Sequence, residues 1–78
     1  MHLGNIVHTI KARRKNLKVN QENLAALSGV GLRTLKQFES GKGNPTLQTI
    51  QKIAEVLGLE ICLKVQTKIT DEEGKNTL

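Results

Sequence analysis

Aromatic side chains are almost absent from this sequence of 78 residues. Phe38 is the only one, and neither tryptophan nor tyrosine occurs. Sheets that bind RNA and platforms that bind single strands both stack bases on aromatic rings. The composition therefore argues against both kinds of nucleic-acid site.

Cysteine and long apolar runs are scarce as well. Cys62 is the only cysteine, which excludes an intramolecular disulfide and fits a reducing compartment. No apolar run approaches the roughly 20 residues that a membrane-crossing helix needs. We therefore expect an intracellular protein with no membrane partner.

Residue sets that carry catalysis or bind metals are also lacking. The chain has no Ser/His/Asp set, no glycine-rich phosphate loop and no paired carboxylates in a plausible pocket. His2 and His8 lie six positions apart, which is not a metal-ligand spacing. We expect no enzyme activity, no metal and no cofactor.

Positive charge is plentiful, with twelve Lys and Arg against seven Asp and Glu. Residues 1–57 hold nine basic and three acidic side chains, whereas residues 58–78 hold three and four. A small basic domain favours a polyanionic partner. The alternative is a surface whose charge serves only solubility.

Four stretches have the apolar spacing of helices, which predicts a mainly α fold. They are residues 4–15, 21–28 and 32–40, and a fourth stretch between a capping Thr46 and Gly58. The residues expected to face the core are Ile6, Val7, Ile10, Leu17, Leu24, Ala25, Leu27, Leu35, Phe38, Leu47, Ile50, Ile53, Ala54 and Leu57.

The second and third stretches are typical of a helix-turn-helix unit. Asn20 is a good N-cap for the second helix, and Gly29 suits the left-handed position that ends it. Ala25 allows the two helices to approach closely, and Val30 is the apolar residue of the turn.

The third stretch has two distinct faces. Leu35 and Phe38 lie on one, while Arg33, Lys36 and Gln37 lie on the other at i, i+3 and i+4 spacing. An apolar back with long hydrogen-bonding side chains in front suits insertion into the DNA major groove.

The end of the chain changes its pattern. Residues 59–67 alternate apolar and polar side chains, which predicts a half-buried strand, and residues 68–78 are polar and predict a flexible tail. We therefore expect a DNA-binding domain over 1–58, a strand over 59–67 and a tail over 68–78.

The residues of the helix-turn-helix unit resemble the phage-repressor-like (Xre/Cro-type) family, and the resemblance covers residues 4–58. It implies a compact lambda-repressor-like bundle of four or five helices that binds a palindromic operator in double-stranded DNA as a homodimer. The matching residues are Gln21, Leu24, Ala25, Gly29, Val30, Thr34, Leu35, Glu39 and Gly41.

The resemblance also implies roles for single residues. The base-contacting residues would be Leu32, Arg33, Lys36 and Gln37, and the phosphate-contacting residues would be Gln21, Thr34 and Lys42. Arg33 can grip guanine and Gln37 adenine, each through two hydrogen bonds, while Leu32 can touch a thymine methyl. The alternative is that the charged members are ordinary solvated helix residues.

Two positions depart from the family pattern. Gly31 stands where a Ser or Thr usually caps the recognition helix, and glycine is only slightly worse as a cap. Leu32 is apolar where a polar base reader is common, which weakens the inference of a sequence preference.

Arg14 and Glu39 are expected to form a structural ion pair. Arg14 lies on the apolar stripe of the first helix, where an unpaired charge is costly. Glu39 ends the recognition helix, where the helix dipole disfavours an acid. The family carries such a pair at these positions. The alternative is that Arg14 contacts a phosphate.

One strand cannot satisfy its own hydrogen bonds, so we expect residues 59–65 to pair antiparallel with a second copy of the chain. The dimerisation residues would be Leu59, Ile61, Leu63 and Val65. This segment resembles the C-terminal strand of HipB-type antitoxins, which also bind a HipA-type kinase toxin. The alternative is an edge strand or an extended arm packed on its own helices.

The sequence thus predicts a DNA-binding transcriptional repressor. The resemblance implies the antitoxin and autorepressor of a HipBA-like toxin-antitoxin system, located in the bacterial cytoplasm and associated with the nucleoid through DNA. The alternative is a stand-alone Xre-type repressor with no toxin partner.

Overall fold

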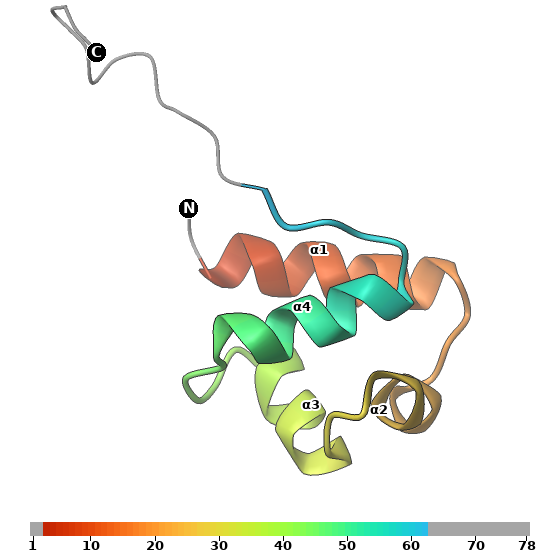
Figure 1. The fold of residues 1–78 in the computed structure, drawn as a ribbon, viewed down its shortest axis with the longest axis horizontal. Coiled ribbons are helices and arrows are strands. Elements are labelled where there is room, and N and C mark those ends of the chain that lie inside the picture. The colour runs from red at the N-terminus through yellow and green to blue at the C-terminus, as the bar shows by residue number, and fades with distance from the viewer. Residues whose placement is uncertain (1–2, 63–78) are drawn as a thin grey trace, which may run out of the picture.

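A computed structural model describes residues 3–62 and contains four helices in that range. They are α1 (Leu3–Asn16), α2 (Gln21–Ser28), α3 (Leu32–Glu39) and α4 (Leu47–Val56). α2 packs against both α3 and α4, and α3 packs against α1 (Figure 1). The prediction of a mainly helical fold is confirmed.

Local hydrogen bonds explain where α2 and α4 begin. The Asn20 side chain accepts from the Asn23 N–H at 2.7 Å, and the Thr46 hydroxyl accepts from the Thr49 N–H at 3.1 Å. Each cap satisfies one of the N–H groups that the first helical turn leaves without a partner. Both caps occur where the sequence placed them.

Glycines in the left-handed conformation end α2 and α4. Gly29 has φ +74° and donates its N–H to the Ala25 carbonyl, which closes α2. Gly58 has φ +71° and follows α4, where the Leu59 N–H reaches back to the Ala54 carbonyl at 2.9 Å. The second arrangement is a Schellman motif, which fixes the direction in which the chain leaves α4.

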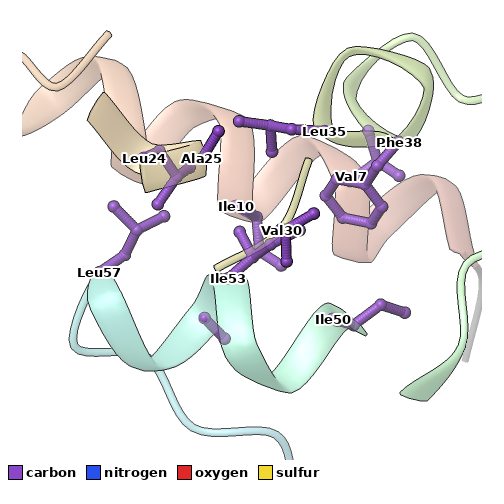
Figure 2. Packing of buried hydrophobic residues seen from close by; sticks show 11 residues of the cluster. Val7, Ile10, Leu24, Ala25, Val30, Leu35, Phe38, Ile50, Ile53 and Leu57 are labelled. Carbon is purple, nitrogen blue, oxygen red and sulfur yellow. The ribbon is translucent and has the colours of Figure 1, made fainter. Parts of the chain in front are cut away.

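The core is built from all four helices and from Val30 in the turn between α2 and α3 (Figure 2). Leu24, Leu35 and Ile53 have no exposed surface, and Phe38 is 2% exposed. Burying side chains of this size contributes about 1.5–3 kcal/mol each. Helix packing therefore holds the short α2 and α3 in place, since helices of eight residues are marginal by themselves.

Three leucines expected in the core lie at the surface instead. Leu27 is 68% exposed, Leu47 is 60% exposed and Leu17 is 44% exposed. Leu27 lies about 100° around α2 from the face that Leu24 and Ala25 bury. Leu47 is the first residue of α4 and lies about one turn before the buried Ile50. Leu17 follows the last residue of α1.

The predicted strand is not formed in the residues that can be compared. Residues 59–62 have no regular secondary structure, and Leu59 and Ile61 are half-buried against the core of their own chain. Leu63, Val65 and the predicted tail lie outside the described residues. The described part of this segment thus follows the alternative of an arm packed on its own helices.

Candidate nucleic-acid interface

The two faces of α3 have opposite environments. Leu35, Phe38 and Glu39 are buried, at 0%, 2% and 5% exposure, whereas the opposite face is exposed to solvent. The exposed side chains of α3 are Arg33, Thr34, Lys36 and Gln37. The back of the helix is thus fixed by packing while its front carries guanidinium, hydroxyl, ammonium and carboxamide groups.

Leu32 differs from the other residues that were expected to contact bases. It is half-buried and packs against the core cluster. Only part of its side chain is therefore presented on the outer surface at the start of α3. Gly31 precedes it as the N-cap and makes no side-chain capping bond.

The loop after α3 brings Lys42 to the same surface. Gly41 and Gly43 both have positive φ, at +81° and +79°, and the Lys42 N–H donates to the Gln37 carbonyl at 3.0 Å. The Gln37 Oε1 atom lies 3.9 Å from the point that a Cβ on Gly43 would occupy. This tight loop therefore holds exposed Lys42 beside the end of the recognition face.

The exposed charge of this surface is of one sign. Arg33, Lys36 and Lys42 are exposed, and the acidic residue of α3, Glu39, is buried and paired. Three cationic side chains on one helix and its following loop favour a polyanion over a neutral or cationic partner. Hydrogen-bond donors along one face of such a helix can pair with base edges and with phosphate oxygens.

Arg14 and Glu39 lie in direct contact beneath this surface. The Arg14 Nε donates to Glu39 Oε2 at 2.7 Å, and a terminal guanidinium nitrogen donates to Glu39 Oε1 at 2.8 Å. The other terminal nitrogen donates to the Val19 carbonyl at 2.8 Å. This two-pronged pair joins the end of α3 to α1 and to the turn that precedes α2.

The ion pair also raises the pKa of Arg14. The hydrogen bonds to Glu39 raise the pKa of the guanidinium above its ordinary value, and burial lowers the pKa by less. A raised pKa in the folded protein means that this group stabilises the fold throughout the neutral and mildly alkaline range. Arg14 is thus a permanent buried cation.

Gln21 is engaged within the protein in a way that the sequence did not indicate. Its Nε2 donates to Glu39 Oε1 at 3.0 Å, so the predicted phosphate contact is joined to the predicted ion pair. Gln21 is the first residue of α2, and Glu39 is the last residue of α3. The hydrogen bond therefore ties together the two helices of the helix-turn-helix unit.

Arg13 has a role that sequence reasoning missed. Its Nε donates to the Leu57 carbonyl at 3.0 Å, and its guanidinium lies beside Gly58. The end of a helix leaves carbonyls without partners, and a cation there is favourable. In the sequence, Gly58 indicates that α4 ends near Leu57. No neighbouring residue indicates which basic side chain of α1 would reach the carbonyls at that end.

The described part of the chain meets the requirements of neither a metal site with three such ligands nor a membrane-spanning helix. Within residues 3–62, no three His, Cys, Asp or Glu side chains lie together in a way that could hold a metal ion. None of the helices in that range has the length and apolar character needed to cross a bilayer.

Comparison with known proteins gives one family match. A model of the helix-turn-helix family matches residues 10–63, which include α2, α3 and α4 and the second half of α1. The match therefore covers every residue of the surface described above.

Two curated relatives are both named "Cryptic phage CTXphi transcriptional repressor RstR". One, from Vibrio cholerae serotype O1, is 37% identical over 49 residues, which are 63% of this chain and 44% of the relative. The other, from Vibrio cholerae, is 33% identical over 66 residues, which are 85% of this chain and 60% of the relative. The chain spans about half the length of the curated relatives it matches.

Proposed function

The chain belongs to the helix-turn-helix family, and from that premise we propose that it is a sequence-specific, DNA-binding transcriptional repressor. One observation carries the proposal. α3 buries Leu35 and Phe38 and exposes Arg33, Lys36 and Gln37 on its opposite face. A packed helix that presents such a row can enter the major groove as a rigid reader.

The exposed residues of α3 read the bases in this proposal. Arg33 donates two hydrogen bonds to guanine, and Gln37 pairs with adenine through its carboxamide. Lys36 reaches a base or the adjacent backbone, and the exposed part of Leu32 touches a thymine methyl. Exposure of the three polar side chains supports these roles.

Phosphate contacts set the register of the complex. Thr34 is exposed on α3, Lys42 is exposed in the loop that follows α3, and Gln21 lies at the start of α2. A helix start favours an anion because its first N–H groups have no helical partner. These contacts fix orientation and carry no sequence information of their own.

Similarity to known repressors supports the regulatory role. Both curated relatives are named as transcriptional repressors, and one aligns with 85% of this chain. We propose that this chain likewise represses transcription by occupying operator DNA in the bacterial cytoplasm, at the nucleoid.

We propose further that the chain binds a palindromic operator as a homodimer. Two reading helices on a symmetric pair would meet half-sites about 34 Å apart. The alternating residues Leu59, Ile61, Leu63 and Val65 supply the apolar side chains for the contact between copies. Leu59 and Ile61 are half-buried, so each retains surface that a second copy can cover.

The segment after α4 favours a second candidate function. Its resemblance to the C-terminal strand of HipB-type antitoxins supports a repressor that also neutralises a HipA-like kinase toxin. Co-purification with the product of a neighbouring gene distinguishes this candidate from a stand-alone repressor. A kinase-like neighbour that does not bind the chain would leave the stand-alone repressor.

Selection from a random pool of DNA duplexes tests the proposed function. The protein is expected to enrich a palindromic motif and to bind it about a thousandfold or more tightly than a scrambled duplex of the same length. Enrichment of no motif, or equal affinity for both duplexes, would contradict a sequence-specific repressor.

A further inference from the structure

We infer that Glu39 and Arg14 position the side-chain amide of Gln21 for a DNA phosphate, in addition to holding the helices together. The inference rests on the proposed function, because it assigns a task within the same DNA-binding surface. It makes Glu39 and Arg14 positioning residues, which act through Gln21 and do not themselves touch the DNA.

The orientation of the Gln21 carboxamide is fixed by chemistry. A carboxylate oxygen only accepts hydrogen bonds, so the group that faces Glu39 Oε1 at 3.0 Å must be the amide nitrogen of Gln21. This hydrogen bond therefore excludes the flipped orientation, in which the carbonyl oxygen would take the place of the nitrogen and repel a phosphate. Without Glu39 the amide would turn freely about its last bond.

The same nitrogen retains a donor for DNA. An amide nitrogen carries two hydrogens, and Glu39 takes one of them. Gln21 is partly exposed, and it begins α2 beside the capping Asn20. The second hydrogen is therefore available to a phosphate oxygen that approaches the start of α2.

The position of Arg14 explains how a phosphate can come so close to a carboxylate. Two oxygens that accept from one amide nitrogen lie about 5 Å apart. A bare Glu39 would repel a phosphate at that distance, but Arg14 donates to both of its oxygens. The ion pair thus offers a neutralised acceptor that orients Gln21 without a net negative charge.

A double-mutant cycle on DNA affinity tests this coupling. Glu39→Gln is expected to weaken binding about tenfold when Gln21 is present and about twofold or less in the Gln21→Ala protein. Each variant is measured well below its own melting temperature, with circular dichroism as the check on folding. An equal loss in both backgrounds would show that Glu39 acts only through the fold and would overturn the inference.

NMR of the unaltered chain keeps the test independent of any unstable variant. One amide hydrogen of Gln21 is expected to exchange slowly in the free protein, and the other is expected to shift when a selected DNA duplex is added. The exposed Gln48 and Gln51 serve as matched controls. Exchange of both Gln21 hydrogens at the rate of these controls would overturn the inference.

Failure of the proposed function and failure of the positioning role give different experimental results. If the unaltered protein binds no duplex, the proposed function itself is wrong. If it binds a selected motif but the losses from Gln21→Ala and Glu39→Gln are simply additive, the proposed function stands and only the positioning role is wrong.

Discussion

Lys18 holds a backbone conformation that glycine adopts more readily. Its φ is +59°, the only positive value at a non-glycine residue within the described range. The Lys18 N–H donates to the Lys15 carbonyl at 3.0 Å, and the Val19 N–H donates to the Arg14 carbonyl at 3.1 Å. Lys18 therefore occupies the left-handed position of a Schellman motif, where a side chain is a steric cost.

Replacing Lys18 with glycine is expected to stabilise the fold. The left-handed strain disappears, while the unfolded chain gains some entropy, so the net gain is about 0.5–1 kcal/mol. Urea denaturation measures it. Lys18→Ala is the control, because it removes the charge and keeps the strain, and an equal gain from both variants would contradict the backbone explanation.

Leu24 and Leu27 were both expected in the core, and the structure separates them. Leu24 is 0% exposed and Leu27 is 68% exposed. Leu24→Ala is expected to cost about 2–5 kcal/mol through the cavity it leaves, whereas Leu27→Ala stays within about 0.5 kcal/mol. Comparable losses in thermal melts of the two variants would contradict the placement of α2.

Arg33 and Lys42 are expected to differ in what they contribute to DNA binding. Arg33→Ala loses about 1–3 kcal/mol of affinity for the selected site and relaxes base preference, while Lys42→Ala weakens binding to all sequences alike. Fluorescence anisotropy with the selected and single-base variant duplexes measures both effects. If Arg33→Ala changes neither the affinity for the selected site nor the base preference, the proposed placement of α3 in the major groove is wrong.

At the scale of secondary-structure elements, the stability of α2 depends on its N-cap, Asn20. It has eight residues, and its one side-chain capping bond runs from the Asn23 N–H to Asn20. A helix this short gains little stability from propagation, so the loss of its cap lowers the stability of the whole helix-turn-helix unit. α2 also supports α3 and α4, against which it packs.

Asn20→Ala is therefore expected to lower the free energy of unfolding by about 1 kcal/mol. Denaturant titration followed by circular dichroism gives the value. Asn44→Ala serves as the matched control, because Asn44 is exposed in the loop between α3 and α4. A loss as large at Asn44 would show that the effect is not due to capping.

At the scale of the whole molecule, salt reports both the charge at the interface and the number of copies. If each copy neutralises about three phosphates, a bound dimer should give a slope near −5 for log K against log salt. A single bound copy should give about half that slope. Anisotropy titrations over a range of KCl concentrations measure the slope, and a value near zero would rule out binding through phosphate contacts.

Sedimentation of the complex supplies the matching control. A dimer on a palindromic duplex has the mass of two chains, and it should fall to one chain on an isolated half-site at low protein concentration. A complex that holds one chain on the full palindrome would contradict the proposed homodimer, while leaving the reading role of α3 intact.

The sequence by itself determined the helices of this protein and the two faces of α3. Asn20 and Thr46 cap the helices that follow them, and Gly29 ends α2 with the left-handed geometry expected of it. These features depend on hydrogen bonds and side-chain spacing within about four residues, so neighbouring residues suffice to predict them. The exposed row of α3 was readable for the same reason.

Only the tertiary structure decided which surfaces of those helices are covered. It left Leu27 in solvent, placed Arg13 on the Leu57 carbonyl, joined Gln21 to Glu39 and laid Ile61 against the core of its own chain. Each of these outcomes depends on where a segment distant in sequence lies. Burial and long-range hydrogen bonds are properties of the packed assembly of helices, and the periodicity of one helix does not contain them.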